Sequence, residues 1–154
     1  MRWIALPMVF ALVSAGCGPS AEEQAAAAAA VEQARQDSIS AEAIAAYDPA
    51  AYDTVTWENA EARMARGQQV YNFSCARCHG PEGLGDGGFV MGGDTLRPPS
   101  FRATDWPMAG DPQAVHQAIF VGTAENMPHW GLEGLKPEAI DAVTYYILEG
   151  LGRD

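Results

Sequence analysis

The pentapeptide at residues 75–79, Cys-Ala-Arg-Cys-His, constrains this chain more than any other stretch. Two thiols separated by two residues and followed at once by an imidazole form the C-x-x-C-H pattern of covalent c-type haem attachment. One tight turn with this spacing brings both thiols to the vinyl groups of a porphyrin edge and places the imidazole beneath the iron. The motif therefore predicts thioether bonds from Cys75 and Cys78, with His79 as the proximal iron ligand.

Two other uses of paired cysteines compete with haem attachment. A structural disulfide or a thioredoxin-like redox pair has the same spacing, but it belongs to an alternating strand–helix context, and no such pattern precedes Cys75. A zinc site needs a second pair of ligands at close spacing. His116 and His129 are too far apart to supply one, so the sequence favours haem.

Residues 1–16 have the features of an export signal. A basic start is followed by an apolar run over residues 3–13, which is too short for a stable membrane-spanning helix, and then by small residues before Cys17. This order resembles the lipobox of bacterial lipoproteins, in which cleavage exposes a cysteine that carries lipid. Ser14 stands where that family prefers leucine, so cleavage by ordinary signal peptidase is the alternative. Either route predicts an exported protein, in keeping with haem c, which is attached outside the cytoplasm.

The cysteine count and the net charge narrow the function further. The three cysteines are all accounted for if Cys17 carries lipid and if Cys75 and Cys78 carry haem. The formal net charge is −11, from 9 Lys and Arg against 20 Asp and Glu. Such a chain is a poor match for nucleic acid or an anionic lipid surface, and it favours a protein partner with a basic docking face.

Residues 17–53 differ in composition from the remainder of the chain. They contain an unbroken alanine run at 25–30 among Glu and Gln residues, all of which favour helix. Their apolar positions are too sparse to form a buried stripe. We expect a partly helical tether between the membrane and the folded domain. A helix that docks on a partner subunit is the alternative.

The folded domain is expected over residues 54–154. Helical spacing of apolar residues predicts one helix that runs into the haem motif, a second from Asp111 to Gly122, and a last helix that begins near Lys136. Gly67 in the first helix is costly unless a second helix approaches it closely. The long connections are rich in glycine, and no recurrent strand signal separates the helices, which indicates an all-α domain.

The glycine-rich connection after His79 is expected to lie against a flat cofactor. The stiff stretch at 97–99, Arg-Pro-Pro, offers carbonyl oxygens as acceptors for the ring N–H of His79.

These features resemble a class I (mitochondrial-type) monohaem cytochrome c over roughly residues 56–153. The likeness implies an all-α fold with three to four helices and long loops around one covalently bound haem c. It also implies that the first and last helices cross near Gly67 and an aromatic residue. The residues that carry the likeness, besides the haem motif, are Gly67, Tyr71, Pro98, Pro99, Met127, Pro128 and Tyr145.

The resemblance makes Met127 the distal iron ligand, opposite His79. Met91 lies in the glycine-rich loop soon after His79, which leaves little chain to reach the far face of a haem. Met108 is the second choice. His129 also competes, but Pro128 separates it from Met127 and disfavours a shared geometry at the iron.

The expected function is electron transfer, because iron with both axial positions filled has no open site for bond chemistry. The runs Cys-His-Gly-Pro-Glu-Gly and Met-Pro-His-Trp resemble bacterial cytochrome subunits of membrane respiratory complexes, such as cytochrome oxidases and alternative complex III. We expect a carrier or subunit that is no enzyme by itself, anchored through Cys17 and facing the periplasm or cell exterior. The alternatives are a haem enzyme or gas sensor with a labile distal ligand, and a structural subunit whose haem only stabilises the fold.

Overall fold

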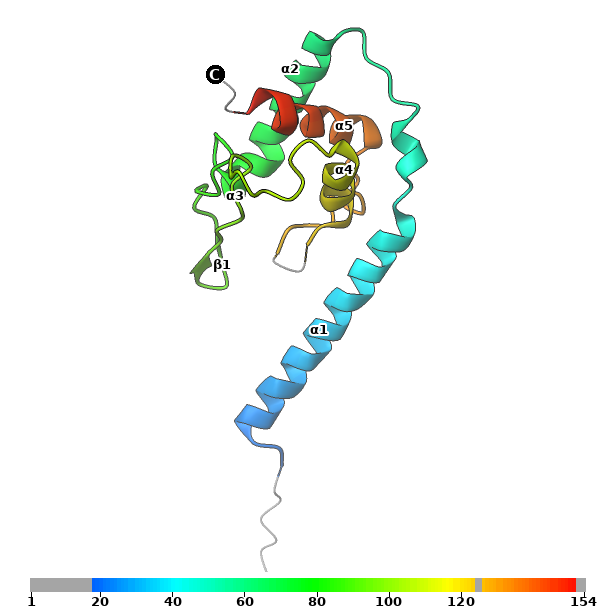
Figure 1. The fold of residues 1–154 in the computed structure, drawn as a ribbon. Coiled ribbons are helices and arrows are strands. Elements are labelled where there is room, and N and C mark those ends of the chain that lie inside the picture. The colour runs from blue at the N-terminus through cyan, green and yellow to red at the C-terminus, as the bar shows by residue number, and fades with distance from the viewer. Residues whose placement is uncertain (1–17, 124–125, 152–154) are drawn as a thin grey trace, which may run out of the picture. The chain divides into compact units, whose positions relative to one another are not determined.

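The computed structural model describes residues 18–123 and 126–151 (Figure 1). Helices make up most of the described chain. Two short strands, β1 (Val90–Met91) and β2 (Asp94–Thr95), pair antiparallel with Val90 opposite Thr95. The predicted all-α class I cytochrome c fold is confirmed. Cys17 and the signal at residues 1–16 lie outside the described residues.

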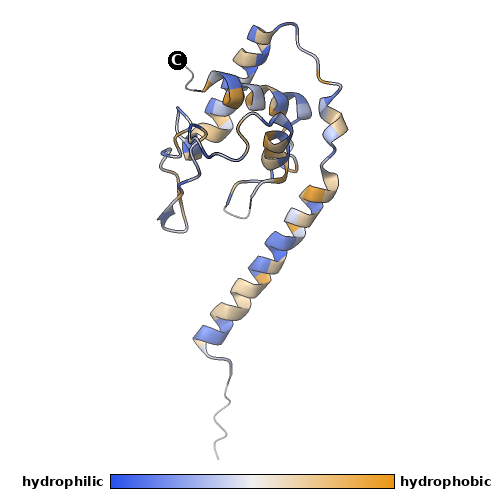
Figure 2. Cartoon of the chain, viewed as in Figure 1, coloured by the Kyte–Doolittle hydropathy of each residue, from blue (hydrophilic) through white to orange (hydrophobic). Residues whose placement is uncertain are grey.

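The chain divides into two compact units, one up to residue 36 and one from residue 37 onward. The first unit contains the N-terminal part of helix α1 (Ala21–Ala46). Ser20 and Glu23 cap this helix reciprocally, since each side chain accepts a hydrogen bond from the other residue's backbone N–H, at 3.1 and 2.6 Å. Residues 18–36 are all exposed, and Figure 2 shows polar and apolar residues mixed along the helix. Within the described ranges, no helix is both long and apolar enough to cross a bilayer.

The second unit is organised by the contact between helices α2 (Ala60–Val70) and α5 (Pro137–Tyr145). A Cβ atom on Gly67 would lie 2.1 Å from the carbonyl oxygen of Ala142 and 2.7 Å from the Cβ of Tyr146. The close approach predicted at Gly67 is therefore confirmed. The aromatic residue at this crossing is Tyr146, whereas the sequence pointed to Tyr145.

Tyr145 and Tyr146 face different neighbours because successive helical residues point about 100° apart. Tyr145 receives the guanidinium of Arg63 over its ring, 4.4 Å from the ring centroid. Tyr146 instead meets Tyr71, with the ring centroids 5.4 Å apart.

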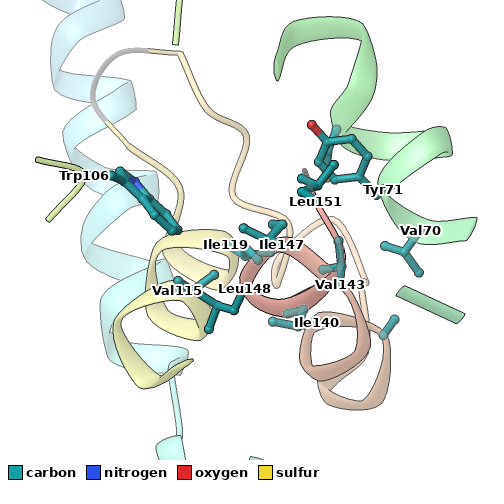
Figure 3. Packing of buried hydrophobic residues seen from close by; sticks show 12 residues of the cluster. Val70, Tyr71, Trp106, Val115, Ile119, Ile140, Val143, Ile147, Leu148 and Leu151 are labelled. Carbon is teal, nitrogen blue, oxygen red and sulfur yellow. The ribbon is translucent and has the colours of Figure 1, made fainter. Parts of the chain in front are cut away.

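The hydrophobic core lies among α2, α4 (Pro112–Val121), α5 and the π-helical turn η3 (Tyr146–Gly150) that continues α5 (Figure 3). Helix α4 begins as predicted, because the side chain of Asp111 accepts from the N–H of Ala114 at 3.0 Å. It ends as predicted at Gly122, whose φ is 77°. The buried apolar residues are Val70, Tyr71, Cys75, Trp106, Val115, Ile119, Ala139, Ile140, Val143, Ile147, Leu148 and Leu151.

A buried polar cluster fixes the segment before α2 to this core. Both carboxylate oxygens of Asp141 accept hydrogen bonds from Arg63, and one also accepts from the indole N–H of Trp57 at 2.7 Å. The ring of His116 lies beside this carboxylate and stacks on Tyr52, with the centroids 4.1 Å apart. His116 is thus a packing residue of this cluster.

Packing within the second unit begins before residue 54. Ala43, in the C-terminal part of α1, is fully buried. Tyr47 contacts Phe120 with a centroid distance of 5.5 Å. Part of the Ala/Glu-rich segment 17–53 therefore packs against the helices that form the core.

Candidate haem-binding site

The C-x-x-C-H motif occupies a continuous helical segment that follows α2. A five-residue π-helical turn, η2 (Tyr71–Cys75), leads into the single turn α3 (Ala76–His79). π-Helical turns inside helices often mark functional sites. Here the turn ends at Cys75, which is buried, and Cys78 follows in α3, where it is half-buried.

Cys75 and Cys78 are free thiols. Burial, with a smaller contribution from Cys78, raises the pKa of the Cys75 thiol to about 12. Redox-active C-x-x-C pairs depend on the opposite shift, a lowered pKa that populates the thiolate. The raised pKa of Cys75 therefore argues against the thioredoxin-like alternative.

His79 is held in the form that binds iron. Burial lowers the pKa of its imidazole to about 4, so the ring is neutral at physiological pH, as metal ligation requires. The ring stacks on Phe101, with centroids 4.5 Å apart and planes 19° apart. Its Nδ1 is buried and has no hydrogen-bond partner among the described residues. The predicted bond from this ring to a carbonyl of residues 97–99 is thus absent.

The loop after His79 folds back over the motif. The hydroxyl of buried Tyr71 donates to the carbonyl of Gly80 at 2.7 Å. The N–H of Gly85 donates to the carbonyl of His79 at 2.8 Å, and that of Gly87 to the carbonyl of Cys78 at 3.2 Å. These bonds come from residues before and after α3 in the sequence, and they stabilise the α3 turn.

Two glycines of this loop allow close contacts within the chain. A Cβ atom on Gly85 would lie 2.0 Å from the carbonyl oxygen of Pro98, and one on Gly87 would lie 2.4 Å from that of Arg77. Gly85 and Gly87 therefore allow backbone to approach backbone, and the predicted contact of the loop with a flat cofactor stays a prediction.

Trp106 is a site residue that the sequence reasoning missed. Its ring packs on Phe101 at 5.1 Å, and Phe101 in turn stacks on His79. The side chain is 6% exposed, and its indole N–H has no partner among the described residues. A buried donor of this kind is costly unless an acceptor is supplied. A tryptophan in an otherwise polar, proline-containing loop was the only signal that marked it.

Two of the candidate methionines pack toward the core and one does not. Met108 and Met127 are partly buried against the hydrophobic cluster. Met91 lies on β1 and is 42% exposed. Met127 follows α4 in a loop closed by a backbone bond from Thr123 N–H to its carbonyl, at 3.3 Å. His129, the other competitor, uses its Nδ1 in a contact with the carbonyl of Val121.

The residues of this region fit a haem c. One helical segment presents two free thiols and a neutral imidazole, which is the donor set that covalent attachment and axial ligation need. The unpaired indole N–H of Trp106 suits a cofactor that carries carboxylates. Among the described residues, no group of three or more His, Cys, Asp or Glu could hold a metal ion.

Comparison with known proteins agrees with this assignment. Residues 62–147, more than half of the chain, match the family model described as cytochrome c oxidase, cbb3-type, subunit III. This segment contains Cys75, Cys78, His79 and Met127. No solved structure matches the chain.

Curated relatives that are subunits of cbb3-type cytochrome c oxidases have modest sequence identity to this chain. The CcoP subunit of the cbb3-type oxidase of Azospirillum sp. (strain B510) is 28% identical over 85 residues, which cover 55% of this chain and 28% of that protein. The CcoP of Rubrivivax gelatinosus is 30% identical over 85 residues, 55% of this chain and 25% of that protein. The FixP of Azorhizobium caulinodans is 33% identical over 84 residues, 53% of this chain and 25% of that protein.

The match therefore spans about a quarter of the length of these relatives. On the family match and on the fold, this chain belongs to the family of cbb3-type cytochrome c oxidase subunit III and contains a cytochrome c domain of class I type.

Proposed function

We propose that this protein is a one-electron carrier that works with, or within, a bacterial respiratory oxidase. The observation that carries the proposal is the pair of free thiols beside a neutral, half-buried imidazole in one helical segment. The family match supports it, and so do four relatives that are subunits of cbb3-type oxidases. The chain is then an electron-transfer protein or subunit, not an enzyme in its own right.

A single haem c would be held by four residues. Cys75 and Cys78 would bind it covalently, His79 would ligate the iron on one side, and Met127 on the other. The bound haem supplies a reversible one-electron change at iron, and a thioether ligand favours the reduced state relative to a second imidazole. With both axial positions filled, ligand exchange is not part of the function, which disfavours the gas-sensor alternative.

The remaining contacts of the site orient and shield the cofactor. Tyr71 holds the start of the glycine loop through Gly80, and this keeps the α3 turn in place. Phe101 and Trp106 build an aromatic wall next to His79, in which Phe101 covers one face of the imidazole. The Trp106 N–H would donate to a haem carboxylate and so satisfy a buried donor that otherwise lacks a partner.

We further propose that the domain works at the outer face of a bacterial membrane. Cys17 would carry the lipid and residues 17–53 would form the tether, the end of which packs on the domain at Ala43 and Tyr47. The partner would present a basic face to this acidic chain. A Cys17→Ser variant should move the haem-containing domain from the membrane to the soluble periplasmic fraction, and retention at high salt would overturn the anchor.

The haem and its ligands are tested together in protein matured by a cytochrome c assembly system. Wild type should show one haem per chain that survives denaturing electrophoresis, and Cys78→Ala or His79→Ala should leave little stable protein. Ferric wild type should show the weak far-red band of His/Met haem and resist cyanide. Met127→Ala should lose the band and bind cyanide, while Met91→Ala should retain wild-type behaviour. Loss of the band in Met108→Ala alone would assign the ligand to Met108.

A further inference from the structure

The C-terminal end of α4 is closed by residues from beyond Met127. The last carbonyls of an α-helix have no partner within the helix. Here the carbonyl of Phe120 accepts from the N–H of Gly131 at 3.1 Å, and the carbonyl of Val121 is contacted by Nδ1 of His129. A carbonyl only accepts hydrogen bonds, so the proton lies on Nδ1 and the ring is the donor. The loop that carries Met127 thus leaves α4 at Gly122 and returns to the same helix end.

The returning segment packs directly on the backbone of the helix end. Gly122 has a φ of 77°, and a Cβ atom there would lie 2.6 Å from the carbonyl oxygen of Met127 and 3.0 Å from His129 Nδ1. Two backbone bonds also cross the described part of this loop: Gly131 N–H to the Phe120 carbonyl at 3.1 Å, and Thr123 N–H to the Met127 carbonyl, which at 3.3 Å is long. The imidazole of His129 is therefore the one side chain that fastens the described part of the loop to the helix.

We propose that His129 is a positioning residue for the distal ligand: by clamping the loop to Val121, its ring holds the sulfur of Met127 in place for the iron. This inference rests on the proposed His/Met ligation. The bond joins residues eight positions apart, so it closes a short loop whose free movement would otherwise carry the sulfur away. Pro128, between the ligand and the clamp, stiffens the connection and transmits the restraint.

A histidine near a haem usually suggests an iron ligand, and His129 has a different role in this proposal. With Met127 as the proposed ligand on that side of the iron, His129 is assigned to the loop instead, through the contact of its Nδ1 with Val121. It acts only through the methionine. Breaking the clamp should raise the fraction of molecules in which the sulfur has left the iron, and cyanide reports that fraction because it binds only to iron with a free position.

The test uses the ferric holoprotein with His129→Ala and His129→Asn. Asparagine places an N–H donor near the position of Nδ1 and should restore part of the clamp. We expect His129→Ala to raise the apparent cyanide affinity about tenfold, the change that corresponds to one net hydrogen bond. It should also weaken the far-red band and lower the reduction potential, and His129→Asn should fall between His129→Ala and wild type.

His116→Asn is the matched control, because His116 is a buried histidine on α4 in the separate Asp141 cluster. It should lower the melting temperature and leave cyanide affinity within about twofold of wild type. If His129→Ala lowers the melting temperature without changing the band, the potential or cyanide affinity, its role is only structural and the inference is overturned. If Met127→Ala keeps the band, the ligand assignment itself is wrong, and the inference falls with it.

Discussion

Arg63 holds both carboxylate oxygens of Asp141 across 78 residues of sequence, with Nη2 to Oδ1 at 2.6 Å and Nε to Oδ2 at 2.8 Å. Parallel hydrogen bonds of this kind are strong and geometrically specific. They join α2, which leads into the haem motif, to α5. The same carboxylate holds Trp57, so the segment before α2 depends on it as well.

Removing the charge of Asp141 should therefore destabilise the whole second unit. We expect Asp141→Asn to lower the free energy of unfolding by about 3 kcal/mol, because the partly buried Arg63 is left without its anion. Chemical denaturation of the holoprotein measures this. The matched control is Glu82→Gln, which removes an exposed pair with Arg102 at 3.4 Å and should cost at most about 1 kcal/mol. Equal effects of the two variants would contradict a special role for Asp141.

Gly67→Ala should destabilise the protein although alanine is the better helix former. The gain in helix propensity is about 1 kcal/mol. The added methyl would meet the backbone of Ala142, which has little freedom to move, and overpacking of this kind costs about 1–3 kcal/mol or more. Melting temperature is the measurement. Gly18→Ala, where a Cβ meets nothing within 4 Å, is the control that should show no loss, and a stabilised Gly67→Ala would contradict the helix crossing.

The stability of the domain should fall on acidification through His116. Burial lowers the pKa of this imidazole, the Arg63 charge adds to the effect and Asp141 opposes it. The native state therefore favours the neutral ring. The contribution of the neutral His116 ring to stability is fully present above the unfolded-state pKa of about 6.5. It is lost as the pH falls from there toward the lowered native pKa.

His116→Phe keeps an aromatic ring for Tyr52 to stack on and removes the titration. Its melting temperature should therefore depend less on pH than that of wild type over the same range. Melting curves of both holoproteins at a series of pH values decide this. Parallel curves would show that another group is responsible.

Contact with the redox partner should involve both charge and Phe73. The acidic chain favours a basic partner, so electron exchange with isolated respiratory membranes should slow as salt rises. Phe73 is 90% exposed and lies two residues before Cys75. An exposed aromatic ring at this place suits a protein contact, so Phe73→Ser should slow the same exchange several-fold.

The control for Phe73 is Val31→Ser, which removes an apolar residue that is 71% exposed in α1. It should leave the rate unchanged. Reduction by ascorbate, which needs no docking, should be equal in all three proteins. A slower reaction with ascorbate in Phe73→Ser would indicate damage to the haem site instead of lost docking.

The sequence by itself determined those features that depend on neighbours along the chain. The C-x-x-C-H spacing fits within one turn, so Cys75, Cys78 and His79 share one helical segment whatever the remaining chain does. The cap at Asp111 and the stop at Gly122 are likewise local, and both were predicted correctly. Gly67 revealed a close helix contact because glycine in a helix is costly without one.

Only the tertiary structure decided what the helices meet. Whether Tyr145 or Tyr146 lies at the crossing depends on the rotation of α5, and the periodic pattern does not resolve one residue. The salt bridge from Arg63 to Asp141 and the unpaired N–H of Trp106 arise between segments far apart in sequence. Such contacts follow from how helices pack in three dimensions, and this is why the sequence indicated the cofactor while the fold revealed the aromatic wall beside it and the clamp at His129.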